Sequence, residues 1–359
     1  MTFRGPLLAE FSKTGLRVHV AAPNLPPSSQ LRVELEERGY TVHEIALVRT
    51  GINPSRDLHT LFELVRLLLR IQPTYVLSYT VKPSIYGSIA ARIAGVPQRF
   101  VLITGLGYAF QGDGKRKLLG VVVRSLYKVA LSGVQKVFFQ NPDDESLFRR
   151  ARLLPAVVPT KIVNGSGVDV AAFSYSEPPV GKMRFLLIAR LLGDKGVREY
   201  ALAAEKIRRE FPGVTFALVG WIDDNPNAIK QEELDEWIQR GDIEYLGRLN
   251  DVRSAIQACN VYVLPSYREG TPRSVLEAMA MGRPIITTDA PGCRETVIDG
   301  DNGLLVPVKS VNGLVAAMQK MITDPIATMR MGRRSRVIAE EKYDVHKVNS
   351  VMLSEMGMI

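Results

Sequence analysis

The stretch PSYREGTPRSVLEAMAMGRPII, residues 265–286, places two glutamates beside a predicted helix start. Glu269 follows an apolar strand pattern, and Glu277 lies on the next helix. Thr271 and Pro272 suit the cap and first residue of that helix. Its free N–H groups would suit a phosphate, and the carboxylates would accept hydrogen bonds from sugar hydroxyls. Taken alone, the glutamates also fit a solvated loop and a surface helix.

A second stretch, FLLIARLLGDKGV, carries two cations. Arg190 stands at the end of a buried strand pattern, where parallel sheets bind ligands, and Lys195 follows in a glycine-flanked loop. Together they would neutralise a diphosphate. The alternative is an arginine paired with a local acid and a solvated lysine. A third loop, DAPGCRE, adds Glu295, either on the same edge or as an acid stabilising a helix start.

Short β-rich runs alternate with helical patterns along the whole chain, which predicts an α/β protein with two doubly wound parallel sheets. The strands predicted in the first half are residues 18–22, 41–47, 75–79, 99–103, 136–140 and 161–164. Those predicted in the second half are residues 185–189, 215–220, 243–246, 261–265, 284–288 and 303–306. The segment SYSEPPVG predicts a domain boundary, giving domains over 1–172 and 173–340 and a C-terminal helix over 341–359.

The chain of 359 residues has a net charge of +9, which fits nucleic acid, an anionic membrane surface or an anionic small substrate. We set nucleic acid aside because no zinc-finger spacing or RNA-recognition motif is present. Cys259 and Cys293 form no Cys-x-x-Cys pair, and no signal peptide or run of 18 apolar residues occurs. We therefore expect a cytoplasmic protein, peripheral on the inner face of the plasma membrane at most.

The segment Lys115–Lys136 predicts a basic amphipathic helix that could lie on an anionic membrane. Its cations are Lys115, Arg116, Lys117, Arg124 and Lys128. The alternative is a domain helix with a solvated basic face.

Several of these segments together resemble the family 4 retaining glycosyltransferases of the GT-B fold, in which two Rossmann-like domains face a cleft. The matching segments are NGSGVD (164–169), ARLLGDKGV (189–197), EYLGRLNDV (244–252), PSYREGTPRSVLEAMAMGRPII (265–286), PGCRE (291–295) and NGLLVP (302–307). The segments DDNPNAI and VKPSIYGSIAARIAGVP are similar to bacterial N-acetylgalactosaminyltransferases and to capsule and O-antigen enzymes that extend sugars on undecaprenyl diphosphate.

The resemblance implies a role for each matched residue. Arg190 and Lys195 would hold the donor diphosphate, and Glu269 would contact hydroxyls of the donor sugar. The other donor-binding residues implied are Gly270 and Thr271 at the phosphate or sugar, Glu277 at the ribose, Glu295, and Gly220, Trp221, Leu246 and Gly247 at the base. Trp221 could instead be an ordinary core or surface aromatic.

The resemblance also implies a metal-free, cofactor-free mechanism that retains the anomeric configuration, with cations stabilising the leaving nucleotide. The aspartate pairs 143–144 and 223–224 are then not metal ligands. The implied substrates are a nucleotide sugar, with a UDP-N-acetylhexosamine such as UDP-GalNAc as the best guess, and a polyprenyl-diphosphate-linked saccharide. Residues on the acceptor side would be Tyr79, Lys82, Thr104 and Gly105, with a plain surface lysine as the alternative for Lys82.

The start of the chain departs from the family pattern. Relatives begin with a strand and a glycine loop, whereas this sequence opens in a helical pattern over residues 4–13. We therefore expect an upstream segment encoding that strand and loop. Two competing functions stay open: a nucleotide-sugar 2-epimerase and a non-catalytic nucleotide-binding subunit.

Overall fold

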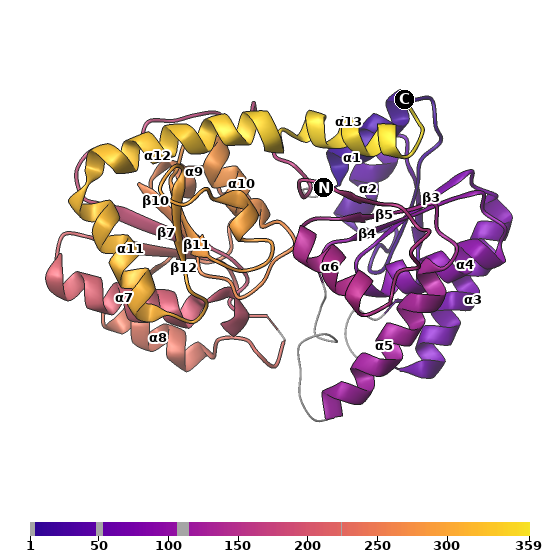
Figure 1. The fold of residues 1–359 in the computed structure, drawn as a ribbon, viewed down its shortest axis with the longest axis horizontal. Helices are drawn as coiled ribbons and strands as arrows, with labels where there is room; N and C mark the ends of the chain where they lie inside the picture. The colour runs from indigo at the N-terminus through magenta and orange to yellow at the C-terminus, as the bar shows by residue number, and fades with distance from the viewer. Residues whose placement is uncertain (1–3, 48–52, 106–114, 224) are drawn as a thin grey trace. The chain divides into compact units, whose positions relative to one another are not determined.

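A computed structural model describes residues 4–47, 53–105, 115–223 and 225–359, without the side chains of residues 115–119 (Figure 1). The chain forms two compact units. Unit 1 comprises Met1–Val163 and Asn349–Ile359, and unit 2 comprises Asn164–Val348. The boundary predicted at residue 172 thus falls inside unit 2, and the chain end belongs to unit 1. No helix among the described residues has the length and apolar character needed to cross a membrane.

Unit 2 is built on one six-stranded parallel sheet in the order β12-β11-β10-β7-β8-β9. The strands are β7 (Arg184–Ile188), β8 (Thr215–Val219), β9 (Glu244–Tyr245), β10 (Val261–Leu264), β11 (Ile285–Thr288) and β12 (Gly303–Val306). The chain order reverses between β7 and β10. Loops that leave the carboxyl ends of strands at such a switch point form the ligand site of doubly wound sheets.

The four central strands of unit 2, β11, β10, β7 and β8, are buried on both faces, which is why they appear in the sequence as continuous apolar runs. Along β7, Phe185 and Leu187 face one core and Leu186 faces the other. Helices α7 (Val197–Glu210), α8 (Gln231–Gln239) and α11 (Val311–Thr323) contribute to the first core. Helices α9 (Arg253–Gln257), α10 (Arg273–Ala280) and the π-helix η5 (Ala339–Tyr343) contribute to the second, while α12 (Pro325–Ile338) contributes to both.

Unit 1 contains two parallel sheets. The larger has the order β3-β4-β5-β6, and the smaller pairs β1 with β2. The strands are β1 (His19–Ala22), β2 (Thr41–Glu44), β3 (Tyr75–Tyr79), β4 (Gln98–Ile103), β5 (Lys136–Phe139) and β6 (Thr160–Ile162). Within the described part of the chain, no strand joins β1 to β3. The first-half strands lie where the sequence predicted them, but they form two sheets instead of one.

The helices of unit 1 are α1 (Gly5–Lys13), α2 (Gln30–Glu37), α3 (Pro54–Ile71), the π-helix η1 (Pro83–Gly87), α4 (Ser88–Ile93), α5 (Lys115–Leu131) and α6 (Pro142–Arg150). The predicted helix over Lys115–Lys136 is too long, because α5 ends at Leu131 and Lys136 begins β5. Lys136 follows a turn at Ser132 and Gly133 and pairs in the sheet with Phe100.

The last helix, α13 (Val345–Glu355), belongs largely to unit 1 (Figure 1). Its Met352 and Leu353 pack with Phe100 and Phe138 in an apolar cluster that also includes Leu7 of α1. Glu355 accepts hydrogen bonds from Lys136 and Lys161, at 2.5 and 2.7 Å. The C-terminal helix is therefore a structural part of the first unit.

Candidate active site

Three loops at the carboxyl edge of the unit 2 sheet are joined by backbone hydrogen bonds. Tyr267 N donates to Asp194 O at 2.8 Å, which ties the loop after β10 to the loop after β7. Glu269 N donates to Pro291 O at 2.9 Å, which ties it to the loop after β11. The predicted chemistry-bearing loops therefore lie together at one place.

Two glycines permit this close approach of the loops. Gly196 has a φ of +71°, and a Cβ there would lie 2.2 Å from Pro265 O. Gly292 has a φ of +81°, and a Cβ there would lie 2.1 Å from Glu269 O. A side chain at either position would be strained and would push the loops apart.

Lys195 and Glu269 form the charged centre of this edge. Lys195 Nζ lies 2.5 Å from Glu269 Oε1, and the two side chains are only 17% and 15% exposed. The buried Ser266 hydroxyl donates to the same oxygen at 2.8 Å. The alternatives of a solvated lysine and a solvated loop glutamate are therefore both wrong. A cation and a carboxylate are held ready at the point where sheets of this type bind ligands.

Arg190 makes a different contact. Its Nη1 donates to Asp223 Oδ2 at 2.9 Å, and its side chain is 46% exposed. The structure thus pairs Arg190 with a nearby acid, as the alternative interpretation had it, while leaving the guanidinium accessible. Asp223 also accepts from Asn225 N at 3.1 Å, which orients its carboxylate.

Glu277 is buried, so the surface-helix alternative is wrong for this residue. Arg273 Nε, one turn earlier on α10, donates to Glu277 Oε1 at 2.7 Å. Burial raises the pKa of Glu277 above its ordinary value, and the bond from Arg273 opposes that rise.

The prediction that Thr271 caps α10 is also wrong. The helix begins at Arg273, and Pro272 occupies the cap position with extended backbone. Thr271 instead packs against the backbone of Gly165, where an added Cβ would lie 2.8 Å from Thr271 Cβ. The Thr271 side chain thus contacts the segment around Gly165, and the preceding residue, Gly270, is buried.

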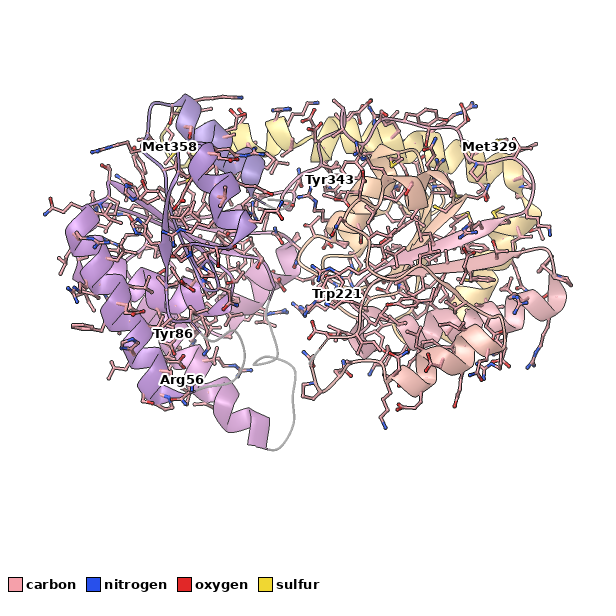
Figure 2. The ribbon with its side chains drawn as sticks, turned by 180° about the vertical axis from the view of Figure 1, so that it is seen from behind. Arg56, Tyr86, Trp221, Met329, Tyr343 and Met358 are labelled. Atoms are coloured by element: carbon pink, nitrogen blue, oxygen red, sulfur yellow. The ribbon has the colours of Figure 1, made fainter. Side chains whose placement is uncertain are left out.

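The residues assigned to the base lie on the loops after β8 and β9. Gly220 N donates to Gly247 O at 2.9 Å, and Leu191 N donates to Trp221 O at 2.9 Å, while Leu246 packs partly buried against the core. Figure 2 shows the position of Trp221 in unit 2. The residue is 39% exposed, and the guanidinium of Arg248 stacks 4.7 Å from its ring centre. Sequence reasoning missed Arg248, although a basic residue directly after Gly247 was a usable signal.

Tyr267 is a second residue that sequence reasoning missed. Its hydroxyl donates to Glu199 Oε1 at 2.6 Å, and Lys309 Nζ lies 5.0 Å above its ring. Burial and the neighbouring Glu199 raise the pKa of Tyr267 well above its ordinary value. The phenol therefore remains a hydrogen-bond donor that ties the loop of Glu269 to helix α7.

Glu295 lies in the short helix η4 (Arg294–Thr296) of the third loop. Its carbonyl oxygen accepts from Tyr343 Oη at 2.5 Å and from Lys342 Nζ at 2.9 Å. Burial lowers the pKa of Lys342. The loop of Glu295 is thereby anchored to the segment that leads into α13.

The acceptor-side candidates lie in unit 1, after β3 and β4. Lys82 Nζ lies 2.7 Å from Asp57 Oδ1 in a largely buried ion pair, so a plain surface lysine is wrong. Burial and Asp57 raise the pKa of nearby Tyr86 to about 12. Tyr79 is exposed, with the guanidinium of Arg4 5.8 Å from its ring centre. The two further candidates, at the last described positions after β4, are Thr104 and Gly105.

The aspartate pairs of the sequence have other partners. Asp144 is buried and bonded to Asn141, and Asp223 binds Arg190, while Asp224 lies outside the described residues. Among the residues that the structure describes, no three His, Cys, Asp or Glu side chains gather as a metal site would require.

Comparison with known families now bears on both units. Residues 2–141 match the family described as glycosyl transferase 4-like, and residues 182–324 match the family described as glycosyl transferases group 1. The chain belongs to the family 4, or group 1, glycosyltransferases. It is therefore a glycosyltransferase, and its α/β units with parallel sheets have a GT-B-like fold.

Individual relatives agree with the family. The glycosyltransferase is 28% identical to an N,N'-diacetylbacillosaminyl-diphospho-undecaprenol α-1,3-N-acetylgalactosaminyltransferase of Campylobacter jejuni, over 93% of this chain and 89% of the relative. It is 28% identical to a UDP-Gal:α-D-GlcNAc-diphosphoundecaprenol α-1,3-galactosyltransferase of Escherichia coli, over 80% and 76%. Sucrose-phosphate synthase from Thermosynechococcus elongatus shares the fold, with a TM-score of 0.79 at 21% identity over 97% and 90%.

Proposed function

We propose that this glycosyltransferase moves an N-acetylhexosamine, with GalNAc as the first candidate, from a UDP-sugar to a polyprenyl-diphosphate-linked saccharide in cell-surface glycan assembly. The observation that carries the donor half is the Lys195–Glu269 pair at the switch-point edge of the unit 2 sheet. The acceptor half draws support from two relatives whose names specify undecaprenyl-diphosphate-linked acceptors. Those names differ in the sugar, so the donor must be found by experiment.

In this proposal the cations act on the leaving group. The bond between the anomeric carbon and the diphosphate oxygen breaks, and its electrons pass to the diphosphate. Lys195 and Arg190 stabilise the charge that develops there, which is where fixed cations lower the barrier most. The acceptor hydroxyl attacks from the same face and gives its proton to the departing phosphate oxygen, so the configuration is retained.

Glu269 would couple donor binding to sugar recognition. One oxygen, Oε1, now receives both the Lys195 ammonium and the Ser266 hydroxyl. A diphosphate that attracts the Lys195 ammonium would leave Glu269 Oε1 able to accept another hydrogen bond. The carboxylate could then accept from hydroxyls of the donor sugar while Ser266 holds its position.

The remaining donor contacts follow the loops around this centre. Glu277, held by Arg273, would accept from the ribose hydroxyls, and Gly270 and Thr271 would donate backbone N–H groups to phosphate or sugar. The base would lie against Trp221, whose exposed ring is stacked with Arg248. On the acceptor side, Tyr79, Lys82, Thr104 and Gly105 of unit 1 remain the candidates.

A binding and transfer experiment tests the proposal. UDP binding is measured by calorimetry and thermal shift, with magnesium and with EDTA, for the wild type and Arg190→Ala. Ligand at 100 times its dissociation constant should stabilise the protein by about 2.7 kcal/mol. We expect binding in EDTA that Arg190→Ala weakens.

The transfer step then uses a panel of UDP-GalNAc, UDP-GlcNAc and UDP-Gal with a prenyl-diphosphate-linked monosaccharide. The anomeric configuration of the product is read by NMR. An inverted product, or UDP binding without transfer to any acceptor, would contradict the proposal. The second result would favour a nucleotide-binding subunit.

A further inference from the structure

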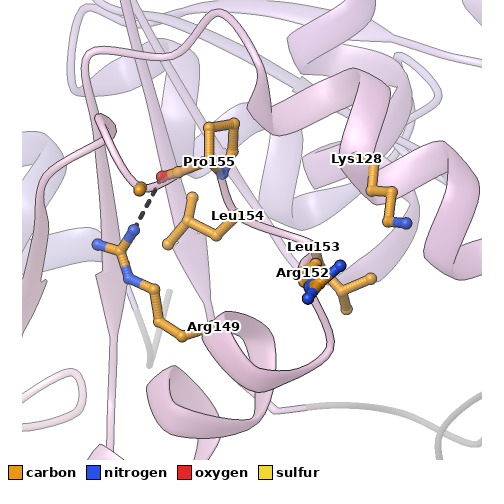
Figure 3. Close-up of a pocket in the computed structure, with 7 residues that line it drawn as sticks. Lys128, Arg149, Arg152, Leu153, Leu154 and Pro155 are labelled. Atoms are coloured by element: carbon orange, nitrogen blue, oxygen red, sulfur yellow. Dashed lines mark hydrogen bonds between the residues drawn. The ribbon is translucent and has the colours of Figure 1, made fainter.

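Unit 1 has a basic pocket of about 430 Å³ on its surface, and none of the predicted acceptor residues lines it (Figure 3). It lies between α5 and the turn that follows α6. Its lining residues are Lys128, Arg149, Arg152, Leu153, Leu154, Pro155 and Ala156. The pocket is therefore lined by both cationic and apolar side chains.

The three cations of this pocket have different roles. Arg149 is structural, because its guanidinium donates to Pro155 O and Val158 O, each at 2.8 Å. Figure 3 shows it bonded across the loop to Pro155, with Lys128 and Arg152 toward the other side. Both of these are exposed, and neither forms an ion pair with a residue in the described part of the chain. Their charge is available to an outside partner.

The exposed face of α5 continues this surface with apolar side chains. Val121, Val122 and Val129 are exposed, Val121 to 56%. Residues seven positions apart lie within about 20° of each other around a helix, so Val121 lines up with Lys128, and Val122 with Val129. Beyond the pocket, Val157 is 89% exposed. Moving such exposed valine side chains out of water into an apolar environment is favourable.

The charge of this surface has a single sign. The sequence contains no aspartate or glutamate from Lys115 to Lys136, nor from Arg149 to Val157. Cations beside exposed apolar side chains complement a bilayer that carries anionic headgroups over an acyl layer.

We infer that this surface, defined as Val121, Val122, Lys128, Val129, Arg152 and Val157, docks the enzyme onto an anionic membrane. Headgroup phosphates would contact Lys128 and Arg152, and the valines would reach the acyl boundary. The inference deepens the proposed function, since a polyprenyl-linked acceptor lies in a bilayer. It names the part of unit 1 that meets that bilayer.

The test is vesicle co-sedimentation of the full chain. Vesicles of phosphatidylglycerol mixed with phosphatidylcholine are compared with phosphatidylcholine alone. A cation near an anionic leaflet contributes about fivefold to binding, so Lys128→Glu with Arg152→Glu should weaken binding by about 25-fold or more. Val129→Ser should weaken it less. The matched control is Arg330→Glu with Arg333→Glu, the same charge change at exposed positions of α12 in unit 2.

The outcomes separate this inference from the proposed function. We expect selective binding to phosphatidylglycerol that is lost in the double variant, kept in the control and reduced by salt. Equal binding by both double variants would overturn it, as would equal binding to both vesicle types. Competition by inorganic phosphate without vesicle binding, or self-association through this surface, would also overturn it. The UDP affinity of the double variant, measured in parallel, should not change. A loss of UDP affinity would show that the substitutions had damaged the donor site or the fold.

Discussion

Lys195 and Glu269 have separable roles in the proposed mechanism, and Glu269→Gln separates them. Lys195 Nζ lies 2.5 Å from Glu269 Oε1 with both side chains largely buried, so a diphosphate must compete with this carboxylate for the ammonium. Glutamine keeps an oxygen that Ser266 can reach but removes the negative charge. UDP affinity should therefore stay the same or rise, while sugar transfer falls.

The magnitudes follow from the kind of contact. A hydrogen bond to a charged group contributes about 1.5–3 kcal/mol, which corresponds to roughly 10- to 150-fold in affinity. Lys195→Met should weaken UDP binding by about that factor. Glu269→Gln should strengthen UDP binding by up to about tenfold, because only part of the competing contact is removed. Its kcat should fall by about 100-fold, as when one preorganised transition-state contact is lost.

Calorimetric titration with UDP in EDTA measures the affinities, and product formation at saturating donor measures kcat. Glu232→Gln and Lys206→Met are matched controls, because both side chains are exposed on helices of unit 2 away from the three loops. If Glu269→Gln weakens UDP binding as much as Lys195→Met does, charge competition is wrong and the pair merely holds the loops together. If kcat stays at the wild-type value, Glu269 has no part in transfer.

Three further predictions concern the framework of the site. In urea titrations, Gly292→Ala should lower the free energy of unfolding by about 2 kcal/mol more than Gly300→Ala, and it should also weaken UDP binding. The reason is that, of these two positions, only at Gly292 would the added Cβ meet backbone, 2.1 Å from Glu269 O. Equal losses of stability in the two variants would contradict the steric argument. In the same assay, Tyr267→Phe should lower the free energy of unfolding by about 1.5–3 kcal/mol, since it removes the 2.6 Å hydrogen bond to Glu199. The control Tyr175→Phe should leave the free energy of unfolding nearly unchanged. If Tyr267→Phe also leaves it unchanged, Glu199 finds another hydrogen-bond donor when the phenol is removed. The Arg198 hydrogen bond holds the pKa of Glu233 at about 2, below its ordinary 4.5. The unfolded state therefore binds this proton more readily than the folded state, so the stabilisation is full above about pH 4.5 and is lost as the pH falls toward 2. Glu233→Gln should reduce the dependence of the free energy of unfolding on pH in this range. Parallel curves of unfolding free energy against pH for the wild type and the variant would refute the linkage.

Much of the architecture could be predicted because its signals are local. Every predicted strand exists. The signal is clearest for the central strands of unit 2, because strands buried on both faces are continuous apolar runs bounded by turn residues. The edge that carries Arg190, Lys195 and Glu269 could also be predicted, because loops after parallel strands meet at one edge. The boundary errors, at α5 and α10, arose where one or two turn residues decide between continuing and ending an element.

The sequence by itself determined which loops lie at the carboxyl edge of the unit 2 sheet, because chain order and strand period assign each loop to a sheet edge. Only the tertiary structure decided which charges meet. Lys195 pairs with Glu269 and Arg190 with Asp223, while Lys82 is buried against Asp57 and Glu277 against Arg273. The place of α13 on unit 1 was likewise decided there, by Met352 and Leu353 packing among side chains from distant strands. Such pairings depend on distances of a few ångströms between segments far apart in sequence, and no local pattern encodes those distances.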